Sequence, residues 1–563
     1  MKKFFILTIS SLAVAAMAVL VWYSPVLFKG YNPTVLGISS LQRANNLAQA
    51  GVYSSENQLN VILSSDLIGQ EGMNSAAGSK FSAYIFSYII KFFGRPSLEN
   101  VILINSIILA LAMFFFSLAV YLLFGFEIFF IFSILYIFIP ANWFLPQDLV
   151  GYQFGILFLS LFILTFAIGN NSWQGNGKNT WVLAVAGIFL ALSGLSKEAL
   201  MVFLPVLMVY LLWRKMYRQL SYIFIPAVAV IGIFWLPDFF SGKNIYLLNF
   251  TGDASSQLKS ADTYYAELFP DSYTYHFDKD AYLKRTSGET GSDFISSVAL
   301  KKQSSNIGQA RLGFFERLKV GTVLFVRHIF RFVSFEEIGG PFVLLFMVLG
   351  IYRLKKERNY YGSFLTFWPL ASIFLMSFVV LVGRNHLVDF GFPITLLLSL
   401  GVSDFSKMLK NQFHSNKSVV VLAITCLLVI YSLVLADRAM WSRFYNNNNV
   451  MLLKTYQKEI LKGKKTGVIA TPLGLNDAYS ISYNTDSSII TFNPKTVENL
   501  LSEGKLSEVF EKYRIRHILG YSPELSKKIN ELTGVEIIAD DGIVCCEDEV
   551  FSANKSWFLN LIK

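Results

Sequence analysis

Residues 101–124 read VILINSIILALAMFFFSLAVYLLF, a mostly apolar run without one charged side chain. A helix needs about 20 consecutive, predominantly apolar residues to cross the hydrocarbon core of a bilayer. This run therefore predicts a membrane-spanning helix. Similar runs lie on both sides of it along the chain.

The composition indicates the same class of protein. The chain has 563 residues, of which 54% are hydrophobic and only 15% charged, with a mean hydropathy of +0.48. Soluble globular domains carry about 25% charged residues. The composition therefore excludes a soluble enzyme, a disordered chain and a disulfide scaffold. The three cysteines show neither paired spacing nor a zinc motif.

Apolar runs predict about eleven spans. The predicted spans are Phe4–Tyr23, Val101–Phe124, Ile128–Phe144, Leu149–Gly169, Trp181–Ser193, Leu200–Trp213, Leu220–Leu236, Pro341–Tyr352, Phe364–Val382, His386–Val402 and Val419–Leu435. Basic clusters at 2–3, 214–218, 353–358 and 407–417 then fall on one side of the membrane. Since cytoplasmic loops carry the excess of Lys and Arg, we expect the N-terminus to be cytoplasmic. The net charge of +10 is thus explained by basic residues at the cytoplasmic ends of the spans, and no nucleic acid partner is expected.

The predicted fold is an α-helical polytopic membrane protein with a small C-terminal extracytoplasmic α/β domain. Residues 1–445 form the membrane domain, with a first outer loop at 25–100 and a large outer loop at 238–340. Residues 446–563 form the soluble domain, because short apolar runs suited to strands alternate there with helical patterns such as Lys495–Tyr513. The predicted location is a bacterial inner or plasma membrane, with membrane lipids as surroundings.

The first outer loop carries two predicted amphipathic helices. Ala44, Leu47 and Ala48 have helical spacing, and Gly51 ends that segment before Tyr53. A second helix is expected at 81–93. Both patterns are typical of helices that lie along a membrane surface.

These features resemble the GT-C superfamily of membrane glycosyltransferases, which includes protein O-mannosyltransferases and aminoarabinose transferases. Ala44, Leu47, Gly51 and Tyr53 match its first-loop segment. Residues 194–199 with 204–205, and 384–386 with 392–393, are similar to its middle and late segments. An outward soluble tail after the last span also fits the family's layout.

The resemblance implies transfer of a sugar from a polyprenyl-phosphate-linked donor to a lipid, glycan or protein acceptor at the outer face. A carboxylate serves such chemistry as general base, and Lys or Arg stabilises the departing phosphate. The family has its catalytic acid shortly before the first-loop helix, but this loop has no Asp or Glu before Glu56. Asp148, Asp66 and Glu71 are therefore the candidate catalytic residues.

Each candidate also has an ordinary structural interpretation. Asp148 has the position of a helix N-cap, and Asp66 and Glu71 have the character of solvated loop acids. Lys197, Arg384, Arg43 and His386 are candidate phosphate- or sugar-binding residues. Lys197 and Arg384 are basic residues on the predicted outer side, against the positive-inside trend. Lys197 also has the position of a snorkelling lysine, and His386 that of a polar interface residue.

Two other functions stay open at this stage. One is an O-antigen polymerase or ligase, which the soluble tail and first-loop helices disfavour. The other is a non-catalytic transferase-like scaffold or lipid-sugar transporter, which the missing first-loop acid favours. No cofactor motif is present. Asp278 and Asp280 are spaced like two calcium ligands, but no complete loop pattern follows them, so no metal is assigned.

Overall fold

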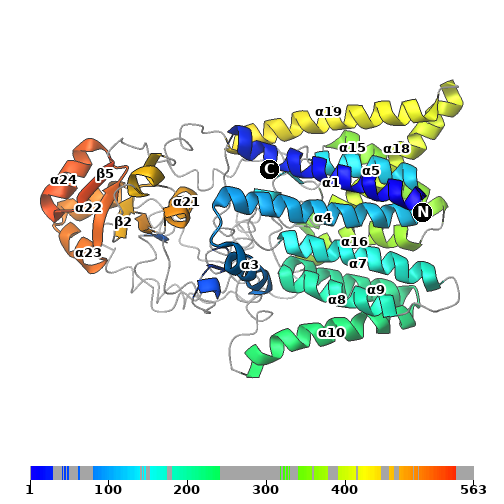
Figure 1. The fold of residues 1–563 in the computed structure, drawn as a ribbon, viewed down its shortest axis with the longest axis horizontal. Helices are drawn as coiled ribbons and strands as arrows, with labels where there is room; N and C mark the ends of the chain where they lie inside the picture. Colours follow the sequence, from blue (N-terminus) through cyan, green and yellow to red (C-terminus); the bar gives the residue numbers. More distant parts are fainter. Residues whose placement is uncertain are drawn as a thin grey trace. The chain divides into compact units, whose positions relative to one another are not determined.

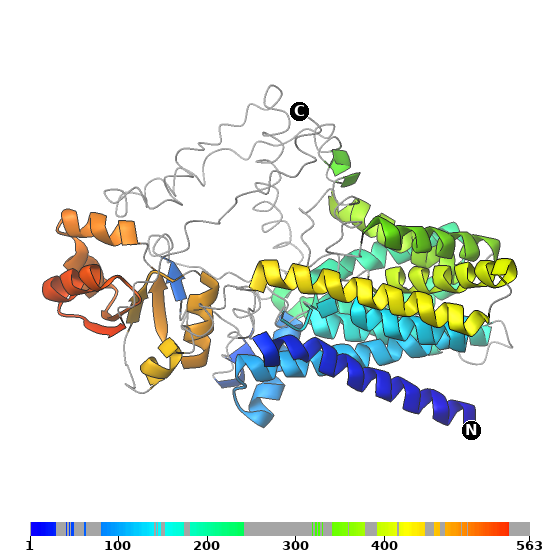
Figure 2. The same ribbon diagram turned by 90° about the horizontal axis from the view of Figure 1, so that it is seen from above.

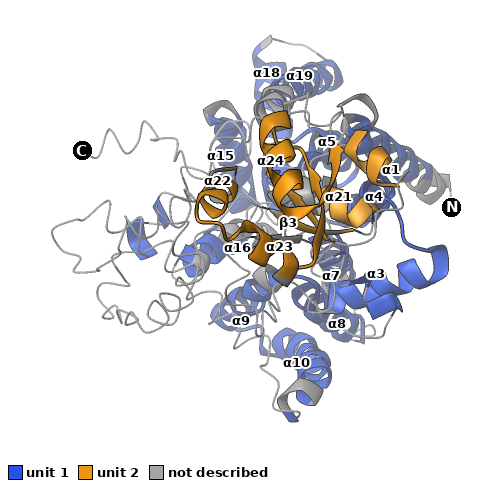
Figure 3. Ribbon diagram, turned by 90° about the vertical axis from the view of Figure 1, so that its left-hand side faces the viewer, with its two compact units in different colours: residues 1–53, 76–273, 311–445 blue, residues 54–75, 274–310, 446–563 orange. Residues whose placement is uncertain are grey.

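A computed structural model of the chain describes part of its sequence. The described residues are 2–29, 41, 44–45, 47–49, 61–63, 80–139, 142–143, 145–147, 152–173, 181–240, 318, 321–323, 325–326, 329, 340–357, 360–377, 391–413, 416–444, 455–461, 468–473, 475–485, 487–491 and 494–539. They divide into two compact units (Figure 3). The first unit comprises residues 1–53, 76–273 and 311–445, and the second comprises residues 54–75, 274–310 and 446–563.

The first unit is helical. Its helices are α1 (Lys2–Lys29), α3 (Lys80–Phe93), α4 (Leu98–Phe124), α5 (Phe126–Phe138), α7 (Tyr152–Trp173), α8 (Trp181–Ser196), α9 (Phe203–Trp213), α10 (Tyr217–Phe240), α15 (Pro341–Lys356), α16 (Tyr360–Ser377), α18 (Gly391–Phe413) and α19 (Lys417–Phe444). Two short 3-10 helices, η1 (Leu145–Gln147) and η2 (Glu198–Val202), precede α7 and α9. Figures 1 and 2 show the long helices running side by side as a bundle.

Five stretches among the described residues are long and apolar enough to cross a membrane by themselves: Leu98–Phe124, Tyr152–Gly169, Tyr217–Leu236, Gly391–Gln412 and Lys417–Val434. Shorter apolar helices include Phe126–Phe138, Trp181–Ser196 and Leu200–Trp213. The membrane class is thereby confirmed. The count of eleven crossings, and their orientation, stay predictions.

Close backbone contacts hold the bundle together at glycines. A Cβ atom on Gly401 of α18 would lie 1.8 Å from the carbonyl oxygen of Phe346 in α15. The contact is reciprocal, since a Cβ on Gly350 of α15 would lie 2.1 Å from the carbonyl oxygen of Leu397. Real Cβ atoms cannot sit so close to another backbone, so α15 and α18 require glycine at both places. Such small-residue contacts are how helices associate in lipid.

Aromatic side chains fill the space between the other helices. Phe392 at the start of α18 stacks on Phe116 of α4, with ring centroids 4.4 Å apart. Phe203 of α9 meets Trp368 of α16 edge-on at 4.2 Å. All four residues are at most 2% exposed. Helices distant in sequence are therefore packed into one apolar core.

The second unit is built on a five-stranded parallel sheet with strand order β1-β3-β2-β4-β5. Its strands are β1 (Val61–Leu63), β2 (Val468–Thr471), β3 (Ser488–Thr491), β4 (Ile515–Leu519) and β5 (Glu536–Ala539). Its helices include α21 (Leu475–Thr485), α22 (Pro494–Ser502), α23 (Leu506–Lys512) and α24 (Pro523–Thr533). A parallel sheet with helical connections confirms the predicted α/β character of this region.

Two details differ from the sequence-based expectation. The single helix expected over Lys495–Tyr513 is wrong, because the chain forms α22 and α23 with a break at Gly504, whose φ is +69°. Glycine adopts this left-handed conformation readily and so ends α22. In addition, the first outer loop supplies strand β1, with Ile62 paired to Ile490 of β3. That strand was not predicted, since three residues are too short for an alternation pattern.

Candidate functional site

Lys197 lies where α8 stops. Its backbone is extended (φ −151°, ψ 122°), and its carbonyl accepts from the amide of Leu200 at 3.0 Å in η2. The α-helical run therefore ends one residue before Lys197, and the side chain leaves from the junction of two elements. The residue is half-buried, which removes part of the water around its ammonium group.

The Lys197 ammonium rests on an aromatic ring. Its Nζ lies 4.3 Å from the ring centroid of Tyr152, the first residue of α7, which is 4% exposed. A cation over an aromatic face gains about 0.5–2 kcal/mol, with more when both groups are desolvated. Within the described part of the chain no carboxylate pairs with Lys197. The ring thus holds the ammonium group through its face, a contact that leaves the charge in place.

Close contacts fix α7 against α8 at this point. The Ser193 hydroxyl of α8 donates to the Gly155 carbonyl of α7 at 2.8 Å. A Cβ on Gly155 would lie 2.6 Å from Leu200 Cδ1 and 3.4 Å from Lys197 Cβ. Glycine at 155 therefore lets the start of α7 approach the Lys197 junction.

The second predicted loop helix reaches the same place. The hydroxyl of Ser82 in α3 donates to the carbonyl of Ser196 at 2.8 Å, and both serines are fully buried. The opposite face of α3 is exposed and aromatic, with Tyr88 and Phe92 59% and 82% exposed. The first outer loop thus places an amphipathic helix beside Lys197, in the same end of the bundle.

The turn that leads to Asp148 lies at this end too. Asn105 of α4 donates from Nδ2 to the Pro146 carbonyl at 3.0 Å, and Gln153 of α7 donates from Nε2 to the Leu145 carbonyl at 3.0 Å. Asp148 itself is outside the described residues. Four positions separate it from Tyr152, so their Cα atoms are at most about 14 Å apart.

Of the seven predicted site residues, Lys197 is described. The others, Asp148, Asp66, Glu71, Arg384, Arg43 and His386, lie outside the described residues. Around Arg43, the described residues of 41–49 are helical, with Leu41, Ala44 and Leu47 buried. Downstream of Arg384, α18 begins at Gly391, where a Cβ would lie 3.1 Å from Oδ1 of Asn142.

Sequence reasoning missed Tyr152, Ser82, Asn105 and Gln153. Only Asn105 carried a signal, as a carboxamide inside the charge-free run 101–124. The other three carry no signal in the sequence, because their partners are known only from the packing of the helices.

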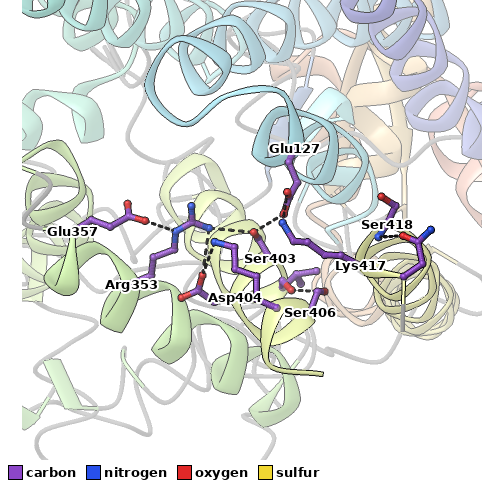
Figure 4. A network of polar contacts seen from close by, with 11 residues as sticks. Glu127, Arg353, Glu357, Ser403, Asp404, Ser406, Lys417 and Ser418 are labelled. Atoms are coloured by element: carbon purple, nitrogen blue, oxygen red, sulfur yellow. Dashed lines mark hydrogen bonds and ion pairs between the residues drawn. The ribbon is translucent and has the colours of Figure 1, made fainter. Parts of the chain in front are cut away.

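The far end of the bundle holds a different polar centre (Figure 4). Glu127 at the start of α5 pairs with Lys417 at the start of α19, and accepts from the Ser403 hydroxyl at 2.6 Å. Arg353 of α15 donates to Ser403 at 3.1 Å and lies 3.5 Å from Asp404. About 29 Å of α4 separates Asn105 from Phe124 near this network. Its cations are matched by carboxylates, whereas Lys197 has none as a partner among the described side chains.

No group of three or more His, Cys, Asp or Glu able to hold a metal occurs among the described residues. The chemistry available at the Lys197 end, as far as it is described, is that of an anion site: one ammonium group, an aromatic ring and a pinned loop helix.

Comparison of this chain with solved structures identifies its fold. The chain resembles the Archaeoglobus fulgidus oligosaccharyltransferase in complex with Zn and sulfate, with 15% identity, coverage of 92% of this chain and 67% of that one, and a TM-score of 0.50. This chain shares the fold of the GT-C membrane glycosyltransferases. The resemblance inferred from the sequence is thereby confirmed at the level of fold.

Two further structures are similar. ArnT from Cupriavidus metallidurans, bound to undecaprenyl phosphate, has 11% identity, coverage of 88% of both chains and a TM-score of 0.49. Archaeal AglB from Archaeoglobus fulgidus, in complex with an inhibitory peptide and a dolichol-phosphate, has 14% identity, coverage of 92% and 69%, and a TM-score of 0.48. No family model and no curated protein sequence matches this chain.

Proposed function

We propose that this GT-C-fold protein is a glycosyltransferase. It transfers a sugar from a polyprenyl-phosphate-linked donor to a lipid, glycan or protein acceptor at the outer face of the membrane. The observation that carries the proposal is the half-buried ammonium of Lys197, which is held on Tyr152 beside α3 and pairs with no carboxylate among the described residues.

The chemistry of the donor explains why such a cation is needed. When the bond from the sugar to the phosphate breaks, negative charge develops on the leaving phosphate oxygen. A preorganised ammonium group in a partly dehydrated place stabilises that charge more than it would in water. The cations Arg353 and Lys417 at the far end are already paired with carboxylates, which makes them weaker candidates.

The other predicted residues complete the proposed site. Asp148 serves as general base for the acceptor, with Asp66 and Glu71 as alternatives. Arg384 and Arg43 bind the donor phosphate with Lys197, and His386 contacts the phosphate or the sugar. Membrane lipids hold the donor chain, and no metal is assigned to the reaction. The outer location rests on the basic clusters at the opposite ends of the spans.

Complementation tests this function. In a strain lacking the gene, the wild-type chain restores one sugar modification of an envelope glycan, lipid or protein, measured by mass spectrometry. We expect Lys197→Ala, Asp148→Asn and Arg384→Ala each to abolish the modification while the protein still reaches the membrane. Lys407→Ala, at the far end, is the matched control and retains it. Normal modification in all three variants contradicts the proposed site.

A further inference from the structure

The turn between α9 and α10 carries three positive charges. Arg214, Lys215 and Arg218 lie within one short stretch of the chain, and Lys215 and Arg218 are exposed. No Asp or Glu occurs over residues 199–237. Lys417 at the start of α19, in contrast, pairs with a carboxylate of α5. The turn therefore carries charge that no acid close by in the sequence balances.

The backbone of the turn favours glycine at the position that Lys215 occupies. The amides of Lys215 and Met216 donate to the carbonyls of Leu212 and Leu211 at 2.9 and 2.8 Å, which is the Schellman arrangement that ends a helix. The left-handed residue of this arrangement is usually glycine, because a Cβ atom is strained there. Lys215 has a φ of +56° all the same. The local fold thus disfavours a lysine, and its ammonium group is the feature that glycine would lack.

Complementing the dipole of α9 does not require Lys215. A cation near the C-terminal end of a helix is favourable, but Arg214 at the C-cap of α9 already supplies one. The second and third charges of the turn therefore call for a partner outside the two helices.

Two exposed aromatic side chains flank the cations. Trp213 is 66% exposed and Tyr217 is 58% exposed. The guanidinium of Arg214 lies 5.1 Å from the ring centroid of Trp213. Trp and Tyr are enriched where a membrane meets water, because their rings lie among the lipid headgroups. These rings therefore place the turn at the level of the lipid phosphates.

The lengths of η2 and α9 agree with that placement. η2 has five residues and α9 has eleven. At about 2.0 and 1.5 Å per residue they extend about 26 Å together, and the hydrocarbon core of a bilayer is about 30 Å thick. Lys197 directly precedes η2. A Lys197 at one surface of the membrane therefore puts the α9–α10 turn near the other.

We propose that Arg214, Lys215 and Arg218, with Trp213 and Tyr217, bind the headgroup of an anionic phospholipid. Guanidinium groups bind phosphate oxygens through paired N–H donors, and lysine adds a compact charge. Basic residues beside a membrane span attract anionic lipids. The ligand is a lipid and not a free phosphate, because the two rings match the boundary between headgroups and acyl chains. This site is separate from Lys197 and does not depend on the transferase reaction.

Native mass spectrometry of the purified full-length protein tests the site. Phosphatidylglycerol and phosphatidylcholine with identical acyl chains are the probes. We expect the wild type to bind phosphatidylglycerol about tenfold more tightly than phosphatidylcholine. In the triple variant Arg214→Gln, Lys215→Gln, Arg218→Gln this preference is lost, while the affinity for phosphatidylcholine stays within about twofold of wild type.

A second triple variant is the matched control. Lys355→Gln, Lys356→Gln and Lys410→Gln remove three exposed cations from the C-terminal parts of α15 and α18. The two triple variants have the same net charge. We expect the control to bind phosphatidylglycerol within about twofold of wild type, because scattered surface charges contribute little.

Lys215→Gly separates lipid binding from folding. Glycine keeps the left-handed backbone without strain, so the midpoint of thermal unfolding in detergent should stay equal or rise. We expect its affinity for phosphatidylglycerol to fall about threefold or more, since one charge near the headgroup is lost. This variant gives the test should the triple variant fail to fold.

Four results would overturn the inference. The first is a wild type that does not prefer phosphatidylglycerol. The second is wild-type affinity for this lipid in the triple variant or in Lys215→Gly. The third is an equal loss in the two triple variants, which would show an effect of net charge alone. The fourth is displacement of the lipid by an excess of inorganic phosphate, which would show a site for free anions.

Discussion

Lys197 and Tyr152 form the residue pair on which the proposed binding site rests. The ring fixes the ammonium group at 4.3 Å without cancelling its charge. A carboxylate partner would hold it equally well but would compete with a phosphate. In the proposed site the pair keeps a cation for the donor phosphate, whereas the Glu127–Lys417 pair joins α5 to α19.

Replacement of Tyr152 tests this interpretation. We expect Tyr152→Leu to weaken undecaprenyl phosphate binding about five- to thirtyfold, since a desolvated cation–π contact contributes about 1–2 kcal/mol. Tyr152→Phe retains the ring and the affinity. Tyr222→Leu, under Arg218 at 5.9 Å, is the control and leaves binding unchanged. Equal binding by Tyr152→Leu and wild type would show that the ring does not prepare Lys197.

The site shows what a sequence can predict at the scale of residues. Lys197 was predictable because it is a cation on the predicted outer side of an apolar protein. Tyr152 and Gln153 were not, because their partners Lys197 and Leu145 are brought to them by helix packing and by a turn. The hydrophobic pattern of a helix predicts which of its faces is buried. It does not predict which side chains of other helices contact that face.

At the scale of elements, the backbones of α15 and α18 approach each other closely at two glycines. The reciprocal glycines Gly350 and Gly401 face carbonyl oxygens at 2.1 and 1.8 Å from their hypothetical Cβ positions. Any larger side chain must separate the two helices. This contact also fixes α18, which follows the segment carrying Arg384 and His386.

Gly401→Leu should therefore destabilise the bundle. We expect a loss of about 3 kcal/mol or more in the free energy of unfolding, at the upper range for overpacked cores. Gly232→Leu in α10 is the matched control, because a Cβ there meets nothing within 4 Å. Thermal unfolding of the two purified proteins measures the difference. Equal midpoints would contradict the close contact.

Elements were predicted well where their pattern was long. Apolar runs anticipated the main helices, and the amphipathic pattern at 81–93 anticipated α3 (Lys80–Phe93). The failures were local: Gly504 divides a helix that apolar spacing made continuous, and β1 is too short to show alternation. The prediction over 495–513 followed the continuous apolar spacing and gave too little weight to the helix-ending effect of a single glycine.

At the scale of the whole molecule, the first outer loop and the C-terminal region share one sheet. Strand β1 at residues 61–63 is an edge strand beside β3 at 488–491, more than 400 positions later. The loop carries first this strand of the C-terminal unit and then α3 of the helical unit. This pairing makes the tail region incomplete without the first loop.

Hydrogen exchange tests the pairing in the full-length protein. Replacement of Val61–Leu63 by Gly-Ser-Gly should speed exchange at Ser488–Thr491, because β3 then becomes an edge with unpaired backbone groups. Exchange at β5, on the far edge of the sheet, should stay unchanged and serves as the internal control. Unaltered protection of β3 would show that β1 contributes nothing to the sheet.

A cryo-EM structure of the full-length protein in nanodiscs, with undecaprenyl phosphate added, would show where the lipid phosphate binds. We expect the phosphate about 3 Å from Lys197 Nζ, at the end of the bundle that carries Tyr152 and α3. A phosphate bound instead among Arg353 and Lys417 at the far end, or no bound lipid at saturating concentration, would contradict it.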